Sequence, residues 1–166
     1  MGAVTNWFMS LVAYIPRELV AFLVSMLPIV ELRGGLPVAS AMGIPWFKGL
    51  IICMAGNLFP IPFILLLIIP IFNWIKKSPK LKARIEALEE KSMSKSDRIK
   101  KYEFWGLLIF VGIPLPGTGA WTGALIAALL GINFKKSMLA ISIGVLLAGG
   151  IMSVISYIIP WLISLI

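Results

Sequence analysis

The chain has 166 residues, 60% of them hydrophobic, and a mean hydropathy of +1.00. Soluble domains contain about 45–50% apolar residues, so this composition excludes an ordinary soluble fold and indicates an integral membrane protein. The formal net charge is +8, but 15 of the 22 charged side chains lie within residues 76–103, which favours an orientation signal over nucleic-acid binding.

The residue types present exclude several chemistries. There is no histidine and only one cysteine, Cys53, so a Ser-His-Asp triad, an intrachain disulfide and a zinc site of histidines or thiolates are impossible. No Walker-type glycine loop occurs, which argues against ATP-driven pumping. Outside residues 76–103, the carboxylates are Glu18 and Glu31. We therefore expect no enzyme activity, no metal and no cofactor.

The first 45 residues contain apolar stretches that are too short to cross a bilayer. Residues 1–15 lack the positive charges of a signal peptide, so we expect them to remain as an interfacial helix or as part of a crossing. Residues 16–28 and 34–43 follow as two arms, each sufficient for about half of the bilayer thickness. The Arg17-Glu18 pair at the start of the first arm is expected to be a surface anchor.

Residues 46–75 form the first segment that can cross fully, because about 20 helical residues span the hydrocarbon core. Three prolines predict that this helix is kinked or broken, namely Pro60, Pro62 and Pro70. Asn57 is polar where an apolar residue is expected. It would either line a cavity or form a hydrogen bond to another helix.

Residues 76–103 separate the two apolar blocks and are expected to face the cytoplasm because of their lysine and arginine excess. Ser78 and Pro79 predict the start of a helix whose apolar face includes Leu81, Ile85 and Leu88. Ser96-Asp97 predicts a second start. We interpret this loop as an amphipathic connector at the membrane surface.

The second apolar block, residues 104–166, has the same plan as residues 1–75. Residues 104–113 and 119–130 are short arms, and residues 134–159 form a full crossing. Small residues in this crossing predict close helix packing or dimerisation, namely Ala140, Gly144 and Ala148.

Each pair of arms is expected to form a re-entrant hairpin, whose irregular turn must be buried in protein or line a cavity. The alternative is one kinked crossing for each pair. An offset of 88 residues superposes the halves, and identical pairs include Gly35 with Gly123 and Gly43 with Gly131. A re-entrant hairpin enters and leaves the membrane on one side, so each half crosses the membrane an odd number of times, and the second half must be inverted relative to the first. The fold predicted is thus a single all-α membrane domain of two inverted repeats, with the C-terminus outside.

Glu31 and Arg33 lie at the turn of the first hairpin, where a charge at membrane depth is costly and marks a pathway, a proton relay or an ion pair. Arg33 would bind an anionic group, and Glu31 would exchange a proton or orient Arg33. The alternative is an ion pair, with each other or with the other repeat, that only holds the turn. Gly34 and Gly35 complete this candidate site.

The turn of the second hairpin is rich in proline and glycine, which fix φ at some positions and permit positive φ at others. The arm after it would direct free N–H groups and the positive end of a helix dipole toward the bilayer centre, as an anion site. Its hydroxyl groups could instead bond local carbonyls. The candidate residues here are Pro114, Pro116, Gly117, Thr118, Gly119, Trp121 and Thr122.

Two motifs, Glu31-Leu32-Arg33-Gly34-Gly35-Leu36-Pro37 and residues 114–123, closely resemble those of the putative small multidrug export protein family of bacteria and archaea. More distantly, they resemble DedA (SNARE-associated, VTT) membrane proteins, which pair a glutamate-bearing re-entrant hairpin with a proline-containing one. That resemblance implies movement of phospholipids or polyprenyl phosphate with proton coupling. DedA proteins usually have an arginine after the second-hairpin proline, whereas Gly117-Thr118 stands here, so Arg33 would supply that charge.

Together these features predict a transporter or flippase for an amphiphile with an anionic headgroup, in the cytoplasmic membrane of a prokaryote. An exporter of small cationic drugs is the alternative, and a structural membrane protein without transport is a third possibility. The expected partners are membrane lipids, the amphiphilic substrate and a second copy of the chain.

Overall fold

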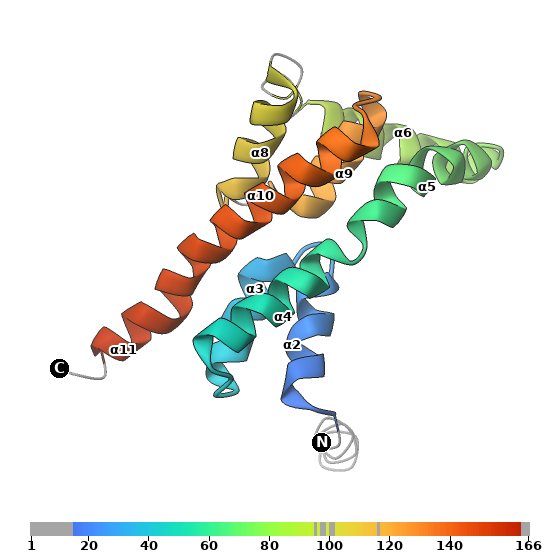
Figure 1. Ribbon diagram of the computed structural model, residues 1–166. Helices are drawn as coiled ribbons and strands as arrows, with labels where there is room; N and C mark the ends of the chain where they lie inside the picture. Colours follow the sequence, from blue (N-terminus) through green and yellow to red (C-terminus); the bar gives the residue numbers. More distant parts are fainter. Residues whose placement is uncertain (1–14, 95, 97–98, 100–101, 116, 164–166) are drawn as a thin grey trace, which may run out of the picture.

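The computed structural model describes residues 15–94, 96, 99, 102–115 and 117–163, and every regular element in these ranges is a helix (Figure 1). The predictions for residues 1–14, for Pro116 and for a helix start at Asp97 concern positions outside the described residues. The all-α prediction is confirmed for the described part of the chain.

The described part of the first half, from residue 15 to residue 75, contains four helices. Helices α2 (Arg17–Met26) and α3 (Glu31–Ala41) contact each other and form the first hairpin. Helices α4 (Trp46–Leu58) and α5 (Ile61–Ile75) together make an apolar span of 30 residues. The span is broken between Leu58 and Ile61, at Pro60, which confirms the prediction from the prolines.

The second half repeats this order with one difference. Helices α8 (Phe104–Gly112) and α9 (Ala120–Leu129) form the second hairpin. Helix α10 (Phe134–Ser153) continues through a π-helical segment, η1 (Val154–Ile158), into α11 (Ile159–Ile163). This second apolar span has 28 residues, from Phe134 to Trp161. Nothing in the sequence analysis predicted the π-helical turn.

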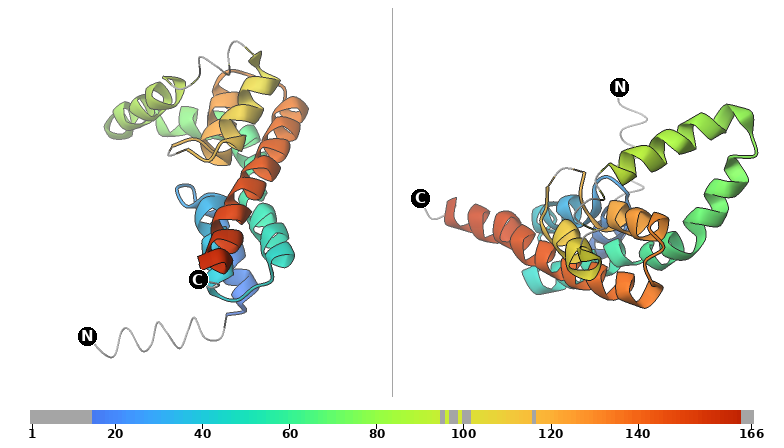
Figure 2. Two further views of the ribbon diagram at one scale, coloured as in Figure 1. Left: turned by 90° about the vertical axis from the view of Figure 1, so that its left-hand side faces the viewer. Right: turned by 90° about the horizontal axis from the view of Figure 1, so that it is seen from above.

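The two hairpins lie at opposite ends of the long helices. Figures 1 and 2 show α3 beside α4 and the C-terminal part of α10, with α2 packed on α3 and α4. At the other end, α8 lies along α10 and α9 lies beside α5. The turns that end α3 and α9 have similar geometry, because Gly43 and Gly131 have φ of +69° and +67°. The inverted repeat and the re-entrant character of the hairpins stay predictions.

The small residues of α10 serve packing within the chain. Ala140, Gly144 and Ala148 are buried, and a Cβ atom at Gly144 would lie 2.9 Å from the backbone oxygen of Leu108 in α8. This contact confirms the predicted close helix packing. The small residues of α10 pack against α8 of the same chain. Cys53 is likewise buried, with its sulfur near Ser25 of α2.

We expect Gly144→Ala to lower stability by about 1–3 kcal/mol, because the added methyl group would overlap Val111 and the Leu108 carbonyl. Gly150→Ala, in the same helix, is the matched control: a Cβ there meets nothing within 4 Å, so the alanine should be neutral or stabilising. Thermal unfolding of the two variants in detergent measures the difference. Equal melting temperatures would contradict the close packing of α8 on α10.

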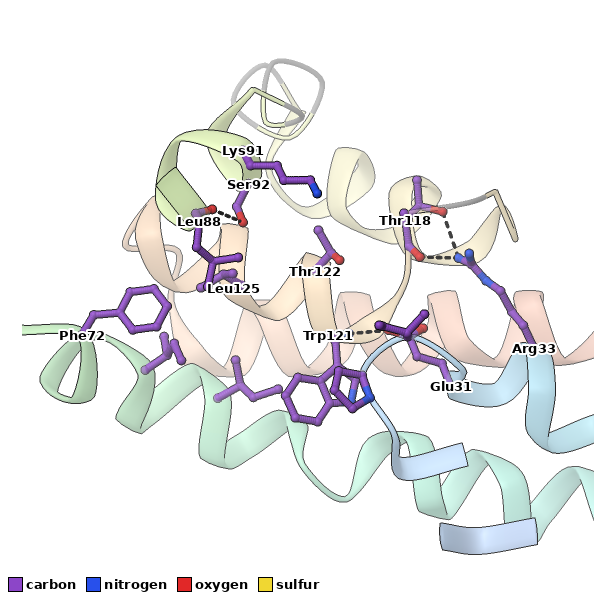
Figure 3. A pocket seen from close by; sticks show the side chains of 15 residues that line it. Glu31, Arg33, Phe72, Leu88, Lys91, Ser92, Thr118, Trp121, Thr122 and Leu125 are labelled. Atoms are coloured by element: carbon purple, nitrogen blue, oxygen red, sulfur yellow. Dashed lines mark hydrogen bonds between the residues drawn. The ribbon is translucent and has the colours of Figure 1, made fainter. Parts of the chain in front are cut away.

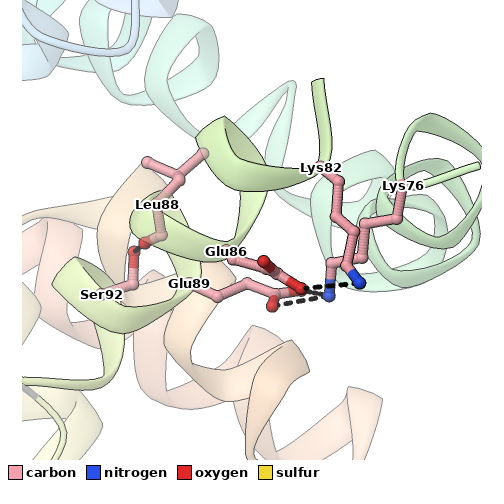
Figure 4. A network of polar contacts seen from close by, with 6 residues as sticks. All are labelled: Lys76, Lys82, Glu86, Leu88, Glu89 and Ser92. Atoms are coloured by element: carbon pink, nitrogen blue, oxygen red, sulfur yellow. Dashed lines mark hydrogen bonds and ion pairs between the residues drawn. The ribbon is translucent and has the colours of Figure 1, made fainter. Parts of the chain in front are cut away.

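Helix α6 (Pro79–Met93) confirms the helix predicted in the charged loop. Ser78 occupies the N-cap position but makes no side-chain cap hydrogen bond. The helix packs against α9 and α5. Lys76, just after α5, donates to both carboxylate oxygens of Glu89 at 2.7 Å and so fixes α6 to the end of α5 (Figure 4).

The surface of the two long spans is largely apolar and exposed, as expected for helices in contact with lipid. The indoles of Trp46, Trp74, Trp105 and Trp161 are all more than half exposed, which suits positions at the membrane interface. Arg17 and Glu18 have specific partners: Arg17 donates to the Met42 carbonyl, and Glu18 accepts from Lys48 at 2.7 Å. The first contact closes the end of the first hairpin that lies away from its turn, and the second joins α2 to α4.

Candidate functional site at the meeting point of two hairpin turns

The carboxylate of Glu31 occupies the N-terminus of α9. Glu31 is the first residue of α3, is only 5% exposed, and has a φ of +49°, a backbone conformation that non-glycine residues rarely adopt. Its Oε1 accepts the N–H of Trp121 at 3.0 Å, and its Oε2 accepts the N–H of Ala120 at 3.3 Å. The first N–H groups of a helix have no partner within the helix, so this carboxylate satisfies two of them.

Gly119 makes room for this contact. A Cβ atom at this position would lie 2.1 Å from Glu31 Oε2, and the φ of Gly119 is +139°. Both facts require glycine, because any side chain would collide with the carboxylate and strain the backbone. The lack of a side chain at Gly119 thus lets the Glu31 carboxylate reach the N-terminus of α9.

Arg33 binds the turn between α8 and α9, on the side that precedes Gly119. Its guanidinium donates to the backbone carbonyls of Leu115 and Thr118 and, at 2.9 Å, to the Thr118 hydroxyl oxygen (Figure 3). That hydroxyl has one proton to donate, and the carbonyl oxygens of Ile113, at 3.0 Å, and Leu115, at 2.8 Å, both lie within its hydrogen-bond distance. The planar, multi-donor guanidinium is suited to collecting several oxygens at once.

Glu31 and Arg33 form no ion pair within 4 Å with each other or with any other described residue, although their opposite charges still interact electrostatically. Residues two apart in a helix point in different directions, and here each side chain reaches a different part of the second turn. Their charges are satisfied by backbone groups instead. The two residues clamp the second turn to the first.

A pocket of about 530 Å³ lies beside this clamp, between the two turns, α5, α6 and α9 (Figure 3). Its polar wall includes Glu31, Arg33, Thr118 and Thr122, and its apolar wall includes Ile64, Ile68, Phe72, Trp121 and Leu125. We call this space the central pocket. A volume of this size with one polar and one apolar side is typical of a ligand site.

A second hollow of about 470 Å³ lies along α8, and we call it the lateral groove. Its lining is mostly apolar and aromatic, with Trp105, Ile109 and Phe110 among its residues. Thr118 borders both hollows, so the second turn separates the central pocket from the lateral groove.

The remaining candidate residues do not all line the central pocket. Gly117 does, whereas Gly34, Gly35, Asn57, Pro114 and Gly119 do not. A Cβ at Gly34 would overlap Val30, and one at Gly35 would overlap Ser25, so these glycines permit packing within the first hairpin. Asn57 is buried in α4, and its Oδ1 accepts no hydrogen bond from any described residue.

Sequence reasoning missed the contribution of α6. Leu88, Lys91 and Ser92 line the central pocket, although residues 76–103 were interpreted only as a surface connector. The available signal was the amphipathic pattern of the helix, which shows that one face is covered but not by what. Trp121 is also more than a lining residue, because its indole N–H donates to the Met26 carbonyl at 3.1 Å and joins α9 to the end of α2.

Comparison with known proteins agrees with the motifs. The model of the putative small multi-drug export protein family matches residues 31–151, more than two thirds of the chain. The match begins at Glu31 and includes both turns, α6 and most of both long spans. No curated protein and no solved structure matches the chain. The chain therefore belongs to the family of putative small multi-drug export proteins, and it is a membrane protein with two helices long enough to cross the bilayer.

Proposed function

We propose that this protein is a transporter or flippase for an amphiphile with an anionic headgroup, such as a polyprenyl phosphate or a phospholipid. The observation that carries the proposal is the central pocket, which offers polar groups on one wall and apolar side chains on the other. Three charged residues line it, Glu31, Arg33 and Lys91, and their formal charges sum to +1. An anionic headgroup with a hydrocarbon tail complements both walls.

Alternating access between two inverted halves is the mechanism we propose. Support comes from the opposite placement of the hairpins and from the matching glycine turns at Gly43 and Gly131. The contact between the hairpin turns rests on a few polar bonds made by Glu31 and Arg33, with the Trp121 indole beside them. A small set of directional bonds between two rigid units can break and re-form as the units rock.

Glu31 is the group that we propose to couple this motion to protons. Its carboxylate now fills the α9 N-terminus, a place suited to an anion. A protonated Glu31 would lose its negative charge and much of its attraction to these N–H groups. Protonation would therefore loosen the contact between the two turns and favour their separation.

The membrane setting follows the sequence prediction. We propose that residues 76–103 face the cytoplasm of a prokaryote and that the C-terminus lies outside, in agreement with the basic character of the loop. The hairpins would then be re-entrant, with Glu31 and Arg33 near the bilayer centre. The wider likeness to DedA proteins rests on the motifs alone. A homodimer would cover part of the exposed apolar surface.

Export of small cationic drugs is the second candidate. The description of the matched family favours it, and Glu31 offers a carboxylate on the pocket wall. For this function Glu31 would have to leave the N–H groups of Ala120 and Trp121 to bind the cation. Arg33 and Lys91 would oppose the bound cation.

Flux in proteoliposomes tests the two candidates. We expect wild type to move a labelled polyprenyl phosphate faster than empty liposomes do, and to leave a labelled cationic dye unmoved. Glu31→Gln should reduce lipid movement at least about tenfold, because two charge-assisted bonds are weakened and proton exchange is lost.

Glu18→Gln is the matched control, because Glu18 is the other carboxylate outside residues 76–103 and its partner is Lys48 at the surface. Its flux should equal that of wild type. Movement of the dye but not of the lipid would establish the cationic alternative. Movement of neither would favour a structural role.

A further inference from the structure

Most of the groups that the sequence predicts to bind the ligand are already bonded within the protein. The α9 N–H groups of Ala120 and Trp121 donate to Glu31, and the Arg33 guanidinium donates to the second turn. The Ser92 hydroxyl donates to the Leu88 carbonyl at 2.8 Å. In this conformation these groups have little capacity left for a ligand.

Two polar groups on the pocket wall remain without a partner among the described residues. The Lys91 ammonium is exposed and forms no hydrogen bond or ion pair with a described residue, whereas the Lys91 carbonyl accepts from the Ser94 hydroxyl at 2.8 Å. The Thr122 hydroxyl forms no hydrogen bond with a described residue. In Figure 3 the Lys91 side chain extends from α6 toward the side of the pocket where Thr122 lies. An ammonium group carries three donors and a hydroxyl carries one, so together they can surround several oxygens of one anion.

Two other lysines in and just before α6, Lys82 and Lys76, are paired with carboxylates. Lys82 lies 3.8 Å from Glu86, one turn along the helix, and Lys76 is held by Glu89 (Figure 4). The Lys76–Glu89 pair also fixes the register of α6, so that Leu88, Lys91 and Ser92 face the pocket. A solvated surface helix would have no need for such a fixed orientation.

We propose that Lys91 of α6 and Thr122 of α9 form the headgroup subsite of the central pocket and bind a phosphate monoester that carries an alkyl chain. The apolar wall of Ile64, Ile68 and Phe72 on α5 receives the chain. This inference rests on the proposed function and changes its assignment of residues. Arg33 becomes a positioning residue for the second turn, and the charged loop becomes part of the binding site.

The test is calorimetric titration of the full-length chain in phosphatidylcholine nanodiscs with hexyl phosphate, a soluble alkyl phosphate. We expect saturable binding by wild type. Lys91→Gln should weaken it at least about tenfold through loss of charge-assisted bonds, and Thr122→Val about threefold or more. Inorganic phosphate and hexanol should each bind more weakly than hexyl phosphate, because each lacks one half of the ligand.

Lys82→Gln is the matched control, since it removes the same charge from the same helix away from the pocket. Its affinity should stay within about twofold of wild type. The subsite is refuted if wild type does not bind hexyl phosphate, if Lys91→Gln binds it as wild type does, or if Lys82→Gln weakens it equally. Inorganic phosphate that binds as well as hexyl phosphate would refute the alkyl-chain part.

These experiments can refute the proposed headgroup subsite and the proposed transport function independently. Binding that depends on Lys91 in a protein without flux would retain the subsite and reject the transport function. Lipid flux that persists unchanged in Lys91→Gln would retain transport and reject the subsite.

Discussion

Gly119→Ala should destabilise the protein by at least about 3 kcal/mol and abolish transport. The alanine Cβ would lie 2.1 Å from Glu31 Oε2 at a φ of +139°. Backbone strain at positive φ costs about 1–2 kcal/mol, and each displaced hydrogen bond to a charged group about 1.5–3 kcal/mol. In detergent, the midpoint of thermal unfolding should fall by about 6–12 °C.

Gly131→Ala separates the cost of backbone strain at positive φ from the cost of the collision with Glu31. Gly131 also has positive φ, +67°, but a Cβ there meets nothing within 4 Å. We expect a loss of only about 1 kcal/mol, a fall of about 2–4 °C, and normal flux. If the two variants melt at the same temperature, the collision with Glu31 has no energetic weight and the contact between the turns is not tight.

Arg33→Lys should cost about 3 kcal/mol and at least about tenfold in flux, although it keeps the positive charge. A lysine ammonium is a compact point charge and cannot span the Leu115 and Thr118 carbonyls as the guanidinium does. At least one carbonyl of the turn would lose its donor. Melting temperature in detergent and lipid flux in proteoliposomes measure the two effects.

Arg17→Lys is the comparison for this variant, because Arg17 makes one hydrogen bond to the Met42 carbonyl at an exposed position. A lysine can replace a single exposed bond, so stability should change by less than about 0.5 kcal/mol. Wild-type flux in Arg33→Lys would mean that charge alone matters at this site. The clamp described for Arg33 would then be incorrect.

Much of the fold could be predicted because its signals are local. Pro60 ends one helix of the first span, and Ser78-Pro79 precedes α6, both through backbone rules that act over a few residues. The turns carrying Glu31 and Thr118 were both predicted to lie at membrane depth, where charges and irregular backbone in an apolar chain need partners.

The partners themselves could not be predicted, because they depend on tertiary placement. Glu31 bonds to backbone N–H groups, which every residue has and which leave no mark in the sequence. Lys91 resembles its nine basic neighbours in the loop, and only the packing of α6 on α9 directs it to the pocket. The π-helical turn at Val154–Ile158 lies between Gly149-Gly150 and Pro160. Glycine and proline favour an irregularity in a helix, but they do not specify a π-helical turn.

The contact between Glu31 and Gly119 has a geometric consequence. These positions are 88 residues apart, the same offset that superposes the halves of the chain. If a two-fold rotation relates the halves, two equivalent positions that touch must lie close to the rotation axis, on opposite sides of it. A carboxylate at both would place two like charges in mutual contact, so this pair cannot remain identical. In such an arrangement the two halves would have to differ in sequence where they meet, at the residues on which the contact depends.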